Sequence, residues 1–133
     1  MSTHETLRRE AFDVAELPSD FDLAGALQKV NDQYGPTGAP CWFLYSGTEF
    51  PGLTVGVRGT VAAVQWVSRD EVLVPASGSG ERGTYFAGGR HEETFPPGSE
   101  VPVADALAAV AEYVRTAQRP TCIEWANLEA VRS

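Results

Sequence analysis

The central part of the chain, residues 41–87, is a succession of short strand-like segments joined by links too short to contain a helix. Within residues 53–58, apolar residues alternate with Thr54, Gly56 and Arg58, which is the two-residue period of a half-buried strand. Comparable segments span residues 41–45, 61–67, 72–74 and 83–87. Parallel neighbours need a crossover of about a dozen residues or more, so strands in direct succession favour hairpins. The pattern therefore predicts an antiparallel meander.

A helix is expected before the meander. Ser19 and Asp20 are good N-cap residues, and apolar residues then recur at helical spacing over residues 23–34. The Gly35-Pro36 pair predicts the end of this helix, because glycine suits the left-handed position after a helix and proline does not continue one.

A second helix is expected after the meander. Residues 95–100 (FPPGSE) predict a loop, and residues 103–114 carry an apolar stripe at helical spacing. Asp105 lies near the start of this stripe, where a negative charge suits the helix dipole. Arg119-Pro120 predicts its end, and residues 121–125 predict a short closing strand.

These elements predict an α+β fold in a single domain, residues 1–133. We expect a mainly antiparallel sheet of about five to six strands, with both helices packed on one face and a closing helix–strand unit at the C-terminus. Residues 1–18 are polar and weakly patterned. They are compatible with either a flexible arm or a first edge strand through Phe12 and Val14.

The chain is acidic, with 18 Asp and Glu residues against 10 Lys and Arg residues and a net charge of −8. Such a chain repels phosphate backbones, so direct nucleic-acid binding is disfavoured. An acidic surface also speeds association with a basic partner, although the charge taken alone favours simple solubility as its explanation. No apolar run reaches the roughly 18–20 residues of a membrane helix, and the N-terminus lacks the apolar stretch of a secretory signal. We therefore expect a cytoplasmic protein without membrane association.

The two cysteines, Cys41 and Cys122, both lie in apolar, strand-like sequence. A free thiol in such surroundings behaves as a small hydrophobic side chain. Nothing else in the chain indicates an oxidising compartment, so a disulfide is not expected.

No motif predicts catalysis, a cofactor or a metal. Residues 78–83 (GSGERG) match G-x-G-x-x-G, but a strand rather than a helix is expected after them, so a mobile hairpin tip is the better interpretation. The sequence His91-Glu92-Glu93 lacks the second histidine of a zinc-protease motif, and His4 is the only other histidine. Adjacent carboxylates such as Asp70 and Glu71 point to opposite faces of a strand, so they do not form an acid–base pair.

Several segments towards the C-terminus follow one another in a distinctive order. They are AGG at 87–89, FPP at 95–97, SEVP at 99–102, an alanine-rich helix, and RPTCIEW at 119–125. This succession resembles family 1 of the bacterial polymorphic-toxin immunity proteins (Imm family 1), which are small cytosolic chains common in actinobacteria. The preceding strands agree in order and length without a sharp motif, and residues 1–18 match nothing in the family pattern.

The resemblance implies a non-enzymatic antidote. Such a protein binds a cognate secreted toxin domain, often a nucleic-acid deaminase or nuclease, and occludes its active site. The residues that match the family pattern are expected to determine the fold: Phe95, Pro97, Val101, Pro102, Leu107, Pro120, Ile123 and Trp125. Toxin contacts are expected on loops and acidic edges instead, and the candidates are Glu49, Asp70, Glu71, Glu92, Glu93 and Glu100. Monomer and homodimer both stay open.

Two other classes of function compete with this interpretation. In a small-molecule-responsive regulatory or ligand-binding domain, the aromatic residues of the sheet would line a pocket: Trp42, Tyr45, Trp66, Tyr85 and Phe86. The three tryptophans, Trp125 included, are more typical of a core than of a ligand platform. In an enzyme with an unrecognised site, His91 would be the best acid–base candidate.

Overall fold

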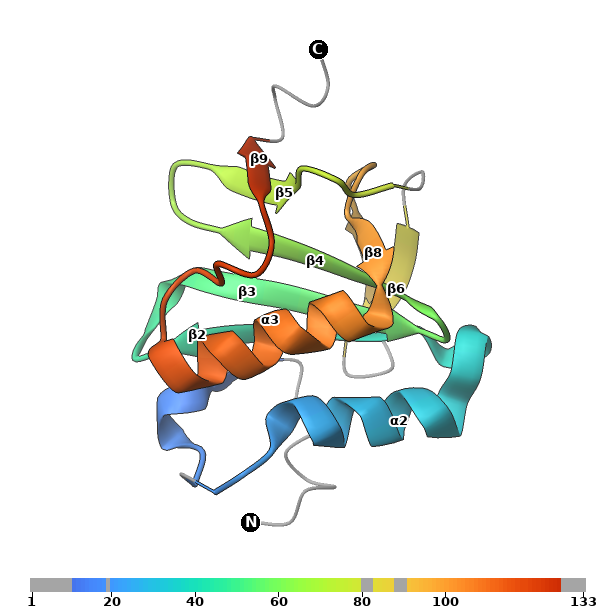
Figure 1. The fold of residues 1–133 in the computed structure, drawn as a ribbon, viewed down its shortest axis with the longest axis horizontal. Coiled ribbons are helices and arrows are strands. Elements are labelled where there is room, and N and C mark those ends of the chain that lie inside the picture. The colour runs from blue at the N-terminus through green and yellow to red at the C-terminus, as the bar shows by residue number, and fades with distance from the viewer. Residues whose placement is uncertain (1–10, 19, 80–82, 88–90, 128–133) are drawn as a thin grey trace.

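The computed structural model describes residues 11–18, 20–79, 83–87 and 91–127, and this part of the chain forms two helices and one sheet (Figure 1). The helices are α2 (Leu23–Gly38) and α3 (Val103–Thr116), and a short 3-10 helix, η1 (Val14–Glu16), precedes them. The strands are β1 (Ala11–Asp13), β2 (Pro40–Ser46), β3 (Thr48–Arg58), β4 (Val61–Val67), β5 (Val72–Pro75), β6 (Gly83–Ala87), β7 (His91–Phe95), β8 (Glu100–Pro102) and β9 (Trp125–Asn127). The fold class is α+β, as predicted.

The strands form one curled sheet in the order β7-β6-β2-β3-β4-β5-β9, with β1 paired to β2 and β8 paired to β4. Strands β2 to β5 are the predicted antiparallel meander. The described residues hold nine strands, so the expected five to six was too low. Strands β1, β8 and β9 have only three residues each, too few to show a two-residue period. Residues 11–13 form the short strand β1, whereas Val14, which the expected edge strand included, begins η1.

The connection from β5 to β6 is not the expected hairpin. Strand β6 pairs in parallel with β2, on the far side of the meander from β5. Ser79 forms an isolated antiparallel bridge with Glu100 instead. Of the predicted tip at residues 78–83, residues 80–82 lie outside the described residues.

Both helices cover the same face of the sheet (Figure 1). Alternate residues of the meander point towards them, and each is at most 7% exposed: Trp42, Leu44, Leu53, Val55, Val57, Ala62, Val64, Trp66 and Leu73. The helices contribute Leu23, Leu27, Ala106, Ala109, Val110 and Tyr113 to this core. Burial of apolar surface stabilises the fold by about 25 cal/mol for each square ångström. The alternation of apolar residues along each strand therefore determines which face packs against the helices.

Helix α2 begins and ends later than predicted. Asp22 caps its N-terminus, two residues after the expected cap, and accepts a hydrogen bond from the Gly25 backbone N–H at 3.0 Å. The helix passes through the Gly35-Pro36 pair and ends at Gly38, before Ala39 turns the chain with a φ of 44°. Proline has a helical φ and removes only one backbone hydrogen bond, so it is tolerated in the last turn when tertiary packing holds the helix.

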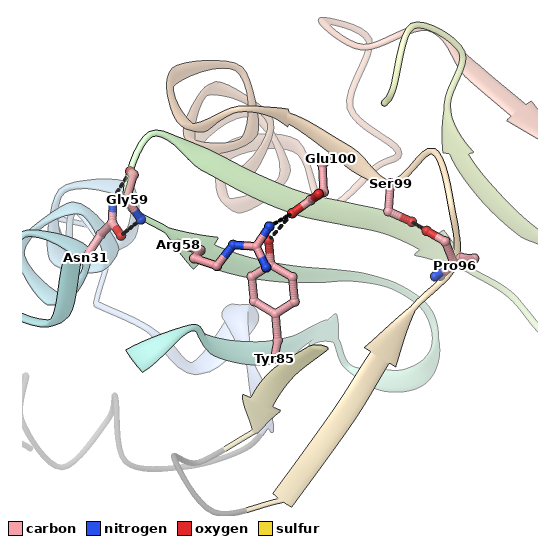
Figure 2. A network of polar contacts seen from close by, with 7 residues as sticks. All are labelled: Asn31, Arg58, Gly59, Tyr85, Pro96, Ser99 and Glu100. Carbon is pink, nitrogen blue, oxygen red and sulfur yellow. Dashed lines mark hydrogen bonds and ion pairs between the residues drawn. The ribbon is translucent and has the colours of Figure 1, made fainter. Parts of the chain in front are cut away.

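Asn31 fastens α2 to the turn between β3 and β4. Its side-chain amide donates a hydrogen bond to the Gly59 carbonyl at 2.6 Å and accepts one from the Gly59 N–H at 2.8 Å (Figure 2). Asn31 is only 3% exposed. This reciprocal pair therefore satisfies four polar groups that the packing of the helix on the sheet removes from water.

The second face of the sheet is closed at one end by β6 and β7. Tyr85 lies over Gly56, where an added Cβ would come within 2.5 Å of the Tyr85 ring. Phe95 meets the Tyr85 ring edge-on, with the ring centres 5.0 Å apart. Cys41 and Ala63 complete this smaller core with neighbouring alanines. A glycine at position 56 is therefore what allows the aromatic ring to close this end.

The connection after α3 differs from the prediction. Strand β9 covers Trp125–Asn127 rather than residues 121–125. The link before it is held by Glu112, whose carboxylate accepts hydrogen bonds from the Thr121 N–H at 2.6 Å and the Cys122 N–H at 3.2 Å. These bonds, that to Thr121 foremost, lower the pKa of Glu112. Cys122 is exposed, so the prediction of apolar surroundings is wrong for Cys122 and confirmed for the buried Cys41.

Candidate functional site

A charged cluster lies at the closed end of the second face. Glu100, the first residue of β8, accepts hydrogen bonds from the Arg58 guanidinium at 2.5 Å and the Tyr85 hydroxyl at 2.9 Å (Figure 2). The Arg58 guanidinium also lies 5.4 Å from the centre of the Tyr85 ring. Burial and the Glu100 hydrogen bond both raise the pKa of Tyr85, so its hydroxyl stays protonated and remains a donor at neutral pH.

The arrangement of this cluster is that of a structural brace. The Glu100 carboxylate is already occupied by the Arg58 and Tyr85 donors, and Glu100 is only 7% exposed. Ser99 donates a hydrogen bond to the Pro96 carbonyl at 2.6 Å, which holds the turn that delivers Glu100 to this position (Figure 2). The geometry therefore supports stabilisation of the closed end rather than chemistry on a substrate.

The other end of the second face is an open groove of about 690 Å³. It is lined by Ala11, Phe43, Leu44, Tyr45, Phe50, Gly52, Thr54, Gln65 and Val67. The pairing of the strands explains why these residues line the groove together. Phe43, Thr54 and Gln65 form one row across β2, β3 and β4. Tyr45, Gly52 and Val67 form the next row. On the other side of the Phe43 row lies the row of Cys41, Gly56 and Ala63, which Tyr85 covers, so the groove begins where β6 and β7 stop covering the sheet.

The lining of the groove combines aromatic and polar groups. Phe50 is one of two large hydrophobic side chains exposed among the described residues, at 37%, and Phe43 and Tyr45 are half-buried. Thr54, which is 5% exposed, and the partly exposed Gln65 add polar groups to the lining. An apolar hollow with a few polar groups on its floor is the usual composition of a binding site.

The predicted acidic contacts fall in three places. Glu49, Asp70 and Glu71 lie at the same end of the sheet as the groove, because the β2–β3 turn and the β4–β5 turn are both at that end. Asp70 and Glu71 are exposed, and the Glu49 side chain is outside the part of the structure that is described.

The other three predicted contacts lie away from the groove end. Glu92 and Glu93 are on β7, the first exposed and the second half-buried. Glu100 differs from the expected acidic edge, because its carboxylate is inside the brace with Arg58 and Tyr85. Three of the six candidates therefore lie at one end of the sheet, and their role in binding stays a prediction.

The residues of the family pattern lie mainly in packed positions. Phe95, Val101, Pro120 and Ile123 are buried, Leu107 and Trp125 are partly buried, and Pro97 and Pro102 are exposed. The Trp125 indole N–H donates a hydrogen bond to the Pro120 carbonyl at 2.9 Å, which ties the closing link to β9. Their role as fold determinants stays a prediction.

The aromatic residues proposed to line a ligand pocket do not meet in one cavity. Trp42 and Trp66 are in the helix-side core, and Tyr85 and Phe86 belong to the smaller core. Tyr45 alone among the five lines the groove. The groove that the structure does show lies on the opposite side of the sheet from the helices.

The described residues show few features that are typical of a catalytic, metal or nucleotide site. In them no group of three or more His, Cys, Asp or Glu side chains is placed to hold a metal ion. Gly83 begins strand β6, so the glycine motif lacks the helix N-terminus that would face a pyrophosphate. His91 lies on β7, but its side chain is outside the described part. Neither α2 nor α3 is long and apolar enough to cross a membrane.

Comparison with known protein families identifies the family of this chain. The family model described as immunity protein Imm1 matches residues 9–127, a span that includes every helix and strand of the described chain. The chain belongs to the Imm1 immunity-protein family. A comparison with curated proteins found no match. The resemblance seen in residues 87–125 is therefore confirmed, and Imm1 membership extends to the meander, where the sequence showed no sharp motif.

The groove of this Imm1 protein was missed at the sequence level. Phe43 and Tyr45 alternate with residues of the helix-side core, so both faces of β2 look equally apolar in the sequence. Only the position of β6 and β7 decides which part of the second face is covered. The exposed Phe50, beside Glu49 at a strand end, was the one local signal of an apolar surface residue.

Proposed function

We propose that this protein is an immunity protein that binds a toxin domain encoded beside it and occludes the active site of that toxin. The observation that carries the proposal is the Imm1 match over residues 9–127. Such a protein would act in the cytoplasm as one partner of a polymorphic toxin system. The toxin is proposed to be a deaminase or nuclease that acts on nucleic acid.

The charge of the chain supports a partner of this kind. An enzyme that handles nucleic acid needs a positively charged surface around its cleft to hold the phosphate backbone. A chain with a net charge of −8 attracts such a surface, and charge complementarity raises the association rate. Blocking by occupation needs no catalytic group on the inhibitor, which agrees with the paired, structural state of the Arg58–Glu100–Tyr85 brace.

Co-expression tests the proposal directly. Cells that produce the toxin domain of the neighbouring gene should die or stop growing, and the same cells should grow normally when this protein is produced with it. Purified protein and a catalytically inactivated toxin domain should form a stable complex by size-exclusion chromatography and calorimetry. The matched control is an Imm1 protein from an unrelated toxin locus, which should neither protect nor bind. Absence of both protection and a complex would refute the proposed function.

A further inference from the structure

We propose that the toxin docks on the open groove, and that it does so with a basic segment that inserts an apolar side chain between Phe43, Tyr45 and Phe50. This inference rests on the proposed function and deepens it by naming the surface and the chemistry of its occupant. It assigns the second face of the sheet to binding, whereas the helix-side face serves the core.

The first argument is the incomplete covering of the sheet. Trp42 and Trp66 point to the helices and are at most 7% exposed, while Phe50 on the second face is 37% exposed. The groove has a volume of about 690 Å³, which leaves room for an inserted side chain. Aromatic residues are enriched at the centres of protein interfaces, where they carry much of the binding energy.

The second argument is the polar floor of the groove. The Thr54 hydroxyl and the Gln65 amide are cross-strand neighbours on β3 and β4. Thr54 is 5% exposed, Gln65 is partly exposed, and both line the groove. Because polar groups that an occupant covers need hydrogen bonds, an occupant that offers a backbone N–H and C=O here would be favoured over a purely apolar one. A polypeptide segment offers both.

The third argument is the charge around the rim. Asp13 accepts a hydrogen bond from the Gly47 N–H in the β2–β3 turn at 3.0 Å, which places its carboxylate at the groove end. Asp70 is exposed in the next turn, where Arg69 is the basic residue. The Glu71 carboxylate instead accepts a hydrogen bond from the Asn127 side-chain amide of β9 at 3.3 Å. This acidic excess selects a basic segment, and rim charges of this kind act mainly on association rate and specificity.

The same charge argues against a second copy of this chain as the occupant. A twofold interface would bring the two acidic rims together, and like charges in contact oppose association. The half-open shape of the groove also differs from the enclosed pockets that bury most of a small molecule. A basic toxin segment is therefore the occupant that fits both the apolar floor and the acidic rim.

The experiment measures binding of the catalytically inactivated toxin domain to four single variants. Phe50→Ser removes the exposed aromatic side chain of the groove. Tyr34→Ser is its control, because Tyr34 is the other large hydrophobic residue exposed among the described residues and lies on α2. Asp70→Lys reverses a rim charge, and Glu92→Lys is its control on β7. Thermal unfolding of each variant confirms that it is folded.

We expect Phe50→Ser to weaken binding by roughly 30-fold, the scale of an interface hot spot, and Tyr34→Ser to stay within about twofold. Asp70→Lys should slow association and flatten its dependence on salt, and Glu92→Lys should change neither. A wild-type protein that binds no toxin refutes the proposed function itself. A wild type that binds, with Phe50→Ser and Asp70→Lys binding equally well, overturns the groove and leaves the function standing. Phe50-dependent self-association of the free protein would also overturn it.

Discussion

Replacement of Glu100 by Gln separates a structural carboxylate from a binding one. Sequence reasoning placed Glu100 among the toxin contacts, whereas the structure places it between Arg58 and Tyr85 at the closed end of the sheet. The variant Glu100→Gln keeps the size of the side chain and an oxygen that can accept the Tyr85 hydrogen bond, but it removes the negative charge. We expect lower stability and an unchanged toxin affinity of the folded protein.

The structure sets the expected size of this effect. Removing one partner of a fully buried ion pair costs about 3–5 kcal/mol. The Arg58 side chain is 33% exposed, so water takes up part of its charge, and the cost should be about 1–3 kcal/mol. For 133 residues at about 2.1 cal/mol/K each, this loss lowers the Tm by about 4–10 °C.

Urea unfolding at neutral pH measures the free-energy change, and calorimetry measures the affinity for the inactivated toxin domain. A double-mutant cycle with Arg58→Met isolates the pair, since the double variant should lose less stability than the two single losses added together. The reasoning is refuted if Glu100→Gln retains the wild-type Tm while weakening toxin binding tenfold. That outcome would restore Glu100 as a contact residue.

Two further variants test other parts of the fold. Asn31→Ala should lower the free energy of unfolding in urea by about 1–3 kcal/mol, because it leaves the Gly59 N–H and C=O without their partner. Asn31→Asp should lower it by less, because it keeps the acceptor. Burial raises the pKa of Tyr113 from 10.0 to about 12, so its stabilising contribution is complete below pH 10 and is lost between pH 10 and 12. Across this range the free energy of unfolding should therefore fall less steeply with pH in Tyr113→Phe than in the wild type. Equal slopes would contradict the assignment.

The meander was predictable because its signal is local. Residues 61–67 form β4 with the predicted bounds, since alternation along one strand reports which face is buried. Helix α2 shows the opposite case, because the Gly35-Pro36 pair signals a stop that the packing of the helix on the sheet overrides. The parallel pairing of β6 with β2 was likewise beyond local reasoning, since it depends on a connection between distant segments.

The groove was less predictable than the fold for the same reason. A carboxylate in a sequence looks exposed by default, and this holds for Asp70 and Glu71 but not for Glu100. An aromatic residue on a strand looks buried by default, which holds for Trp42 and fails for Phe50. Both errors arise because burial on the second face depends on how far β6 and β7 extend over it, and no single strand carries that information.

The closed end and the open groove are two consequences of one packing arrangement. Phe95, which belongs to the family pattern, packs against Tyr85, and Tyr85 in turn covers Gly56. This stack ends one row before Thr54, so Phe95 and Tyr85 set the limit of the groove without lining it. Side chains such as Phe50 and Val67 are then free to differ between related proteins without disturbing either core. A shared scaffold with a separate, changeable binding face is what an antidote family needs if each member is to recognise its own toxin.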